Sequence, residues 1–190
     1  MKSNHLFTPL HRVLHWAIAI GMLTLFFTGF LRMYWMSKKT IIQVVESVLQ
    51  SENMAMTKDQ IIPIAKSIQS PMWEWHVYAA YLILFAFSVR IIYMIMKGIK
   101  FPNPFTKGQT LKDYLQGFTY LLFYLLIAIS TFTGFYLKWF EGDWKEPLEA
   151  IHKWAIYWFP IFIFLHLGGI VLAELTNKKG ITSKMIGGDE

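Results

Sequence analysis

The sequence contains no cysteine in its 190 residues. Disulfide bonds, thiolate metal sites, iron–sulfur clusters and covalently attached c-type haem all require cysteine sulfur, so none of them is built from this chain. Charged residues are also few, at 16%, whereas 55% of the residues are hydrophobic. That balance is unlike a soluble domain and predicts a membrane-embedded one. A redox cofactor in such a chain must be held by ligands other than cysteine.

The charge of the chain gives little support for a nucleic-acid partner. The formal net charge is +6, but the lysines and arginines cluster at the ends of apolar runs. Basic residues at such positions are typical of membrane proteins, whose cytoplasmic loops are enriched in Lys and Arg. We therefore expect the chain to contact membrane lipid and no nucleic acid.

Four long apolar runs dominate the sequence, at residues 14–35, 73–96, 114–137 and 151–174. Each has about the length that a helix needs to cross the hydrocarbon core at roughly 1.5 Å per residue. The first run is too long for the apolar part of a signal peptide, so we expect it to be retained. These runs predict an all-α fold, an integral membrane four-helix bundle that forms a single domain over residues 1–190.

The longest polar stretch, residues 37–71, also carries a helical pattern. Apolar residues recur at helical spacing in both of its halves, and a Thr-x-x-Gln capping signal at residues 57–60 precedes the second half. We expect an extra helical hairpin in this first external loop, with Pro63 shifting or kinking the second helix. The hairpin has two interpretations: a surface element on the bundle or the membrane interface, or a docking platform for a partner.

Histidines recur at one interval in the apolar runs. His152 and His166 are fourteen residues apart, which places their rings on one helix face to within about 40° and roughly 21 Å apart along the axis. The same interval separates His15 from Gly29. Gly29 takes the place of a second His without a side chain, which permits close approach of a flat ligand.

The interval of fourteen occurs a third time, between His76 and Arg90. The second span therefore presents a His and an Arg on one face, at two depths. An Arg inside a span needs an anion.

Four spans place both termini on one side of the membrane, and the charges indicate which side. The segments expected beside the termini are strongly basic, whereas the opposite side balances its basic residues with Asp and Glu. The positive-inside rule then predicts cytoplasmic termini, with residues 37–71 outside.

This topology pairs the histidines by depth. His15, at the inner start of the first span, matches His166, and His76 matches His152 at the outer starts of their spans. Two imidazoles from facing helices are the axial ligands of a low-spin b-type haem, and helix-bundle cores hold such cofactors. We therefore predict two haem sites, one near each side of the membrane.

Four stretches also carry a resemblance to a known family. They are LHW at residues 14–16, WHVYAAYLILFAFSVRIIY at 75–93, IHKWAIYWFPIFIFLH at 151–166 and NKKGITSKMIGG at 177–188. The chain resembles the prokaryotic di-haem cytochrome b family, which includes bacterial cytochrome b561 and the membrane cytochrome b subunits of nickel–iron hydrogenases and related periplasmic oxidoreductases.

The resemblance implies that His15, His76, His152 and His166 are the axial ligands of two haem b groups. It also favours an electron-transfer subunit of an oxidoreductase complex in the bacterial cytoplasmic (inner) membrane over an independent enzyme. Its expected partners are the quinone pool, through quinone or menaquinone, and a periplasmic redox protein or enzyme subunit such as a hydrogenase or a multihaem cytochrome c. The long loop 37–71 departs from the compact stand-alone members and favours a specialised external partner.

Several other residues are candidates for the cofactor site. Arg12 and Arg90 are possible counter-ions for haem propionates, although basic residues near span ends also reach the interface without a ligand. Gly117 and Gly134 lie near the two ends of the third span, where small residues serve helix packing or haem clearance. Gly29 is the third glycine of this set.

Three further residues complete the sequence predictions. His11 is one turn before His15 and either faces a quinone or is a solvated interfacial residue. His5 is assigned to the N-terminal tail. Pro160 lies between the two histidines of the last span and is expected to kink its helix.

Two alternative functions remain open on the sequence. The chain could be a stand-alone oxidoreductase that oxidises superoxide and reduces quinone, or a haem-free membrane anchor whose histidines join helices by hydrogen bonds. A homodimer is an open oligomeric state.

Overall fold

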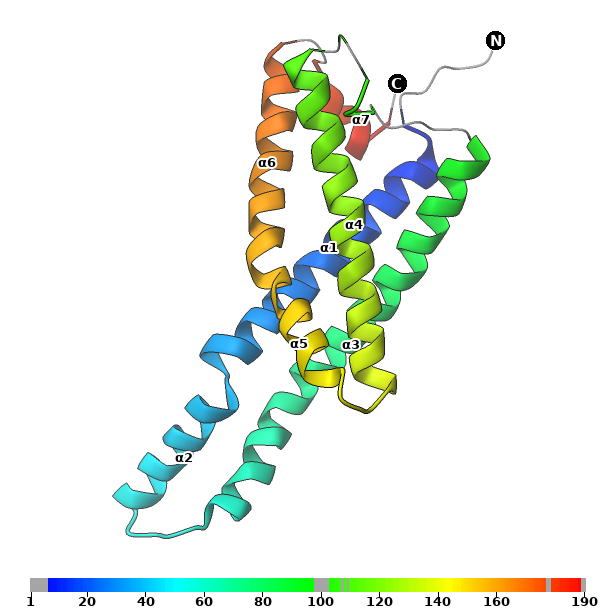
Figure 1. The fold of residues 1–190 in the computed structure, drawn as a ribbon. Coiled ribbons are helices and arrows are strands. Elements are labelled where there is room, and N and C mark those ends of the chain that lie inside the picture. The colour runs from blue at the N-terminus through cyan, green and yellow to red at the C-terminus, as the bar shows by residue number, and fades with distance from the viewer. Residues whose placement is uncertain (1–6, 98–102, 107, 109, 177–178, 189–190) are drawn as a thin grey trace. The chain divides into compact units, whose positions relative to one another are not determined.

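The computed structural model describes residues 7–97, 103–106, 108, 110–176 and 179–188, and these contain helices and no strand. The predicted tail residue His5 lies outside this part. Figure 1 shows the helices in chain order. They are α1 Pro9–Phe30 with a π-helical turn Leu31–Trp35, α2 Lys38–Ser51, α3 Lys58–Lys97, α4 Leu111–Trp139, α5 Lys145–Lys153, α6 Ala155–Leu175 and α7 Ile181–Ile186.

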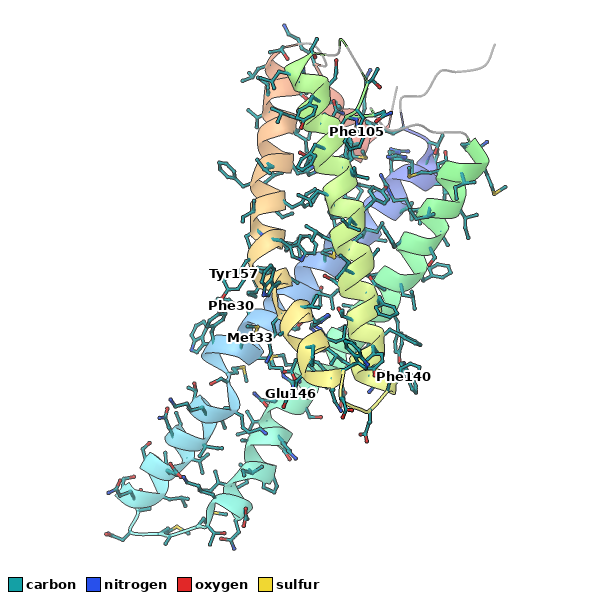
Figure 2. The ribbon with its side chains drawn as sticks, in the orientation of Figure 1. Phe30, Met33, Phe105, Phe140, Glu146 and Tyr157 are labelled. Carbon is teal, nitrogen blue, oxygen red and sulfur yellow. The ribbon has the colours of Figure 1, made fainter. Side chains whose placement is uncertain are left out.

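Four helical segments are long and apolar enough to cross a membrane. They are Pro9–Trp35, Lys58–Lys97, Leu111–Trp139 and Lys145–Leu175. Few of their side chains are buried, and large apolar residues are exposed along them, among them Phe30 and Tyr157 in Figure 2. Such exposure suits helices that face lipid. The predicted fold class, an all-α membrane protein with four spans and an extra helical hairpin, is confirmed.

The chain divides into two compact units, and the first consists of Met1–Ala19 and Ile83–Glu190. In it, α4 packs against α5 and α6, and Phe123 of α4 stacks on Phe162 of α6 with ring centroids 4.2 Å apart. A hydrogen bond of 2.7 Å between Thr8 Oγ1 and Tyr93 Oη joins the start of α1 to the end of α3. The histidines of α1, α5 and α6 all belong to this unit.

The second unit, Ile20–Leu82, contains the helical hairpin. Ser37 caps α2 by accepting a hydrogen bond from the Thr40 amide at 3.2 Å. The first turns of α3 bury Ile61, Ala65 and Gln69, which are four residues apart and therefore share a face. Gln69 donates to the Met36 carbonyl at the base of the hairpin.

The structure differs from the expected hairpin in one respect, because its second helix does not end at residue 71. The capping signal is confirmed, since the Thr57 amide donates to Gln60 Oε1 at 2.9 Å, but α3 then continues for 40 residues through Pro63 and Pro71. Both prolines lie on the exposed side of the helix. Water can therefore reach the carbonyls that lose an N–H partner there.

The fourth span is interrupted earlier than its proline suggests. Pro160 lies inside α6, but the helix breaks at Trp154, which separates α5 from α6. The Trp154 amide donates to the Ile151 carbonyl at 3.1 Å, a contact of the tighter i to i−3 type. His152 and His166 consequently lie on two successive helices.

We predict that the substitution Ala65→Leu destabilises the hairpin. Ala65 has 0% exposure, so a larger side chain has no room and should cost about 1–3 kcal/mol. Thermal unfolding of the purified protein should begin at a lower temperature. The exposed neighbour Ser67→Leu is the control, and equal unfolding temperatures for the two variants would refute the buried position of Ala65.

Candidate functional site

Two of the four predicted ligands face each other. His15 of α1 and His166 of α6 have ring centroids 6.0 Å apart with 44° between the ring planes. Phe162 stacks on His166 at 5.4 Å and 16°, so one face of that imidazole is supported by an aromatic ring. The structure therefore brings together two side chains that are 151 residues apart, from 15 to 166, in the sequence.

The separation of these rings fits an iron held between them. His binds divalent metals through bonds of about 2.0 Å, and two such bonds plus the two half-rings come to roughly 6 Å. Among the described residues, no hydrogen bond reaches a ring nitrogen of His15 or His166. Their donor set, two imidazoles from two helices, suits haem iron.

Arg90 supplies a second observation beside this pair. Its Nε donates to Tyr124 Oη on α4 at 2.6 Å, and it lies close enough to act electrostatically on His11 and His15. Arg90 Nη1 is buried and finds no acceptor in the described part of the chain. A buried guanidinium N–H without an acceptor points to an anion that completes it, and a haem propionate is such an anion.

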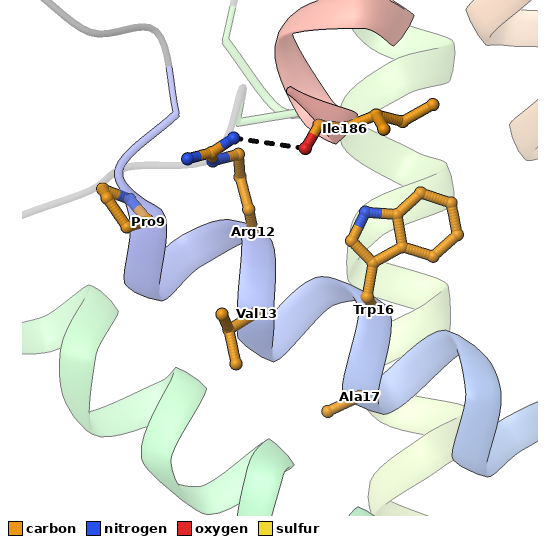
Figure 3. A pocket seen from close by; sticks show the side chains of 6 residues that line it. All are labelled: Pro9, Arg12, Val13, Trp16, Ala17 and Ile186. Atoms are coloured by element: carbon orange, nitrogen blue, oxygen red, sulfur yellow. Dashed lines mark hydrogen bonds between the residues drawn. The ribbon is translucent and has the colours of Figure 1, made fainter. Parts of the chain in front are cut away.

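Arg12 belongs to the same unit and contacts the end of α7, Ile181–Ile186. Its Nη1 donates to the Ile186 carbonyl at 3.2 Å (Figure 3), and Trp16, one turn along, donates to the Met185 carbonyl at 3.3 Å. Both bonds satisfy carbonyls in the last turn of α7, where a helix leaves its final carbonyls without partners of its own. Arg12 Nε is also buried, and no described residue accepts from it.

A shallow pocket surrounds this arginine. The pocket lining is apolar apart from the guanidinium, as Figure 3 shows. Apolar walls with one polar group suit a flat organic ligand that carries a polar substituent. The lining residues are Pro9, Arg12, Val13, Trp16, Ala17 and Ile186.

His76 has a different surrounding, formed within the second unit. Its Nδ1 lies 2.7 Å from Thr28 Oγ1 of α1. Trp73 stacks almost parallel to its ring at 4.9 Å and 7°, and the Arg32 guanidinium carbon lies 3.9 Å from the centre of the Trp73 ring. These contacts hold the imidazole from its Nδ1 side and one face.

His152 is held in a similar way within the first unit. Its Nδ1 lies 3.1 Å from both the Ser130 carbonyl and Thr133 Oγ1 of α4. A Cβ added to Gly134 would lie 3.0 Å from His152 Cε1. Gly134 therefore leaves room for the imidazole of His152.

The other predicted glycines behave differently. Gly117 is buried in α4. A Cβ on Gly29 would meet none of the described atoms within 4 Å, so the space beside it is open. Gly168 and Gly169 of α6 have the same open space, so the approach of a flat ligand to Gly29 stays a prediction.

Sequence reasoning missed the hydroxyl partners of the histidines, Thr28 and Thr133. A signal was present, because the sequence Phe-Thr-Gly-Phe occurs at residues 27–30 and again at residues 132–135. Tyr124, the acceptor of the Arg90 bond, was missed as well, and it stands in an aromatic run without a distinguishing pattern.

Comparison with protein families matches residues 6–188 to the prokaryotic cytochrome b561 family. The match includes all four candidate spans and all four predicted haem ligands, His15, His76, His152 and His166. No curated protein and no solved structure matches the chain.

We predict that Gly134→Ala weakens retention of haem b. The added methyl group lies 3.0 Å from His152 Cε1, so the imidazole must shift and its 3.1 Å contacts to Ser130 and Thr133 lengthen. The ratio of haem to protein, measured after prolonged washing, should fall. Gly169→Ala in α6 is the control, because a Cβ there meets none of the described atoms within 4 Å. Equal haem retention in the two variants would contradict this role of Gly134.

Proposed function

Because the chain belongs to the prokaryotic cytochrome b561 family, we propose that it is a di-haem cytochrome b that carries electrons between the quinone pool and a periplasmic redox partner. The family and the four apolar spans establish a multi-pass membrane cytochrome of the b type that acts in electron transfer. The number of haems, the two electron partners and the orientation in the bacterial inner membrane are parts of the proposal.

The facing pair of His15 and His166 is the observation that carries this proposal. Two imidazoles with centroids 6.0 Å apart have the separation that two axial ligands of one iron require. We assign the first haem b to this pair. Bound haem supplies reversible one-electron chemistry, while these residues position it and exclude water.

We assign the second haem b to His76 and His152, as the matched depths in the sequence predict. Each of these imidazoles has Nδ1 beside a threonine hydroxyl, so their local surroundings are of the same kind. The open space beside Gly29, the buried Gly117 and the close approach at Gly134 are compatible with flat ligands in the spans.

Arg90 is proposed as a propionate counter-ion of the first haem, since it has a buried N–H without an acceptor among the described residues. Arg12 has the same property and is proposed for the same side. Both lie in the unit that contains His15 and His166. Two cations close to one haem stabilise its reduced, more negative form and so raise its potential.

The pocket around Arg12 is the proposed quinone site. Its apolar walls suit a quinone ring, the guanidinium suits a quinone oxygen, and His11 lies one residue away in the sequence. Its proximity to the pair of His15 and His166 would allow direct electron exchange with the first haem.

The hairpin of α2 and the start of α3 is the proposed docking platform for the periplasmic partner. Positive-inside reasoning puts residues 37–71 outside, with both termini in the cytoplasm. The hairpin exposes two pairs of apolar side chains at helical spacing. These pairs are Val44 with Val48 and Ile64 with Ile68.

We expect wild-type protein to contain two b haems per chain by the pyridine haemochrome assay. His15→Ala and His166→Ala should impair one and the same site, and His76→Ala and His152→Ala the other, because each haem needs both ligands. His11→Ala should keep two haems. A colourless wild type would establish the haem-free anchor instead, and a single haem would make one histidine pair structural.

The quinone site is tested by the kinetics of haem reduction with a soluble quinol. His11→Ala and Arg12→Ala should slow this reduction at least several-fold, because one variant removes the imidazole next to the pocket in sequence and the other removes its guanidinium. The control is Lys112→Ala, which removes a cation at the start of α4. Its haem should be reduced by the quinol at the wild-type rate. The assignment is wrong if the double variant of His11 and Arg12 matches the wild type. Reduction by superoxide at a comparable rate would support a stand-alone superoxide:quinone oxidoreductase.

A further inference from the structure

A repeated tetrapeptide places a threonine hydroxyl against two different histidines. Phe-Thr-Gly-Phe spans residues 27–30 in α1 and residues 132–135 in α4. Thr28 Oγ1 is 2.7 Å from His76 Nδ1, and Thr133 Oγ1 is 3.1 Å from His152 Nδ1. Four residues repeated in two spans thus make the same contact to the same ring nitrogen.

The direction of the hydrogen bond at His76 follows from the single proton of a hydroxyl. Thr28 Oγ1 lies 2.7 Å from the Thr24 carbonyl and 3.1 Å from the Leu25 carbonyl, and these oxygens only accept. The Thr28 proton is therefore used within α1, and its oxygen accepts from His76. His76 Nδ1 carries the hydrogen in this network.

The assignment at His152 is firmer, because a backbone carbonyl is also involved. Ser130 O lies 3.1 Å from His152 Nδ1, and a carbonyl oxygen only accepts. Thr133 Oγ1 donates to the Ile129 carbonyl at 2.8 Å, so it also accepts from His152. Both histidines are thus Nδ1–H tautomers, and Nε2 is the nitrogen with a lone pair.

We propose that Thr28 and Thr133 are positioning residues that, together with the Ser130 carbonyl at His152, fix His76 and His152 as Nδ1–H tautomers and thereby lower the potential of the haem that they hold. This inference rests on the proposed function. An imidazole that donates from Nδ1 is a more electron-rich ligand at Nε2 and stabilises ferric iron. The rings of His15 and His166 receive no such bond from the described residues. The two haem sites consequently differ in ligand hydrogen bonding.

A purely structural role for the hydroxyls is the competing explanation. Threonines in helices commonly donate to a carbonyl four residues earlier. Thr24 donates to the Ile20 carbonyl at 2.9 Å and Thr119 to the Leu115 carbonyl at 2.8 Å, and neither contacts a histidine. They are matched controls, because they lie in the same two helices as Thr28 and Thr133 and make the same backbone bond.

The experiment compares threonine variants of the full-length protein in detergent. Haem content is measured first by the pyridine haemochrome assay, and the haem potentials by equilibrium potentiometry with optical detection. The variants are Thr28→Val, Thr133→Val and their combination, the hydroxyl-retaining Thr28→Ser and Thr133→Ser, and the controls Thr24→Val and Thr119→Val.

We expect Thr28→Val to raise one of the two potentials and leave the other in place. Thr133→Val should raise the same potential by less, because the Ser130 carbonyl still accepts from His152 Nδ1, and the double variant should show the largest rise. The serine variants should restore the wild-type value, and the controls should keep it. Where a valine variant loses one haem, its serine counterpart should retain both.

Two results would overturn the inference while the proposed function stands. The first is that both valine variants keep the wild-type haem potentials. The second is that the valine variants and the Thr24 and Thr119 controls show equal shifts of potential or equal losses of haem. Failure of the serine variants to restore the potential or the haem would also overturn it. A wild type without haem would defeat the proposed function itself before any variant is compared.

Discussion

The cost of placing an imidazole in an apolar helix shapes this structure more than any other interaction. A buried polar group without a partner costs about 1–3 kcal/mol, and more in hydrocarbon than in a protein core. His76 and His152 meet this cost through Nδ1, which lies within hydrogen-bond distance of oxygens of another helix. His15 and His166 have no such bond in the described part of the chain and face each other instead. The first arrangement orients a ring, and the second places two imidazole rings opposite each other.

The arginines follow from the same cost. Tyr124 holds Arg90 by one nitrogen and the end of α7 holds Arg12 by another, yet each guanidinium keeps a buried N–H that no described residue satisfies. A cofactor with two carboxylates would satisfy both and would neutralise the cations in an apolar region. The unpaired donors and the facing imidazoles thus indicate the same kind of ligand, a haem.

The hairpin distinguishes this chain from a compact protein that consists of four spans alone. Because α3 is continuous from Lys58 to Lys97, the helix that carries His76 also forms one side of the hairpin. Arg32 and Trp73 stack on the His76 side of that helix. A partner that docks on the hairpin would therefore contact an element joined by unbroken helix to His76, the proposed haem ligand.

The sequence alone determined the four spans, the helical hairpin and the candidate histidines, because apolar length and helical periodicity are local properties that survive without knowledge of neighbours. It also indicated the capping of α3 at Thr57. It did not indicate that α3 passes through Pro71, because that depends on whether the freed carbonyl is exposed to solvent. Nor did it place the break at Trp154, since Pro160 was the stronger local signal.

Tertiary structure decided which groups meet. Only folding could show that His15 and His166 lie 6.0 Å apart, or that Gly134 makes room for an imidazole of the following helix. Thr28 and Thr133 look like ordinary helical threonines in the sequence. Their role is visible only in the distances from their hydroxyls to His76 and His152. Contacts between distant residues depend on the packing of helices against one another, and helical periodicity specifies a face without specifying what lies opposite it.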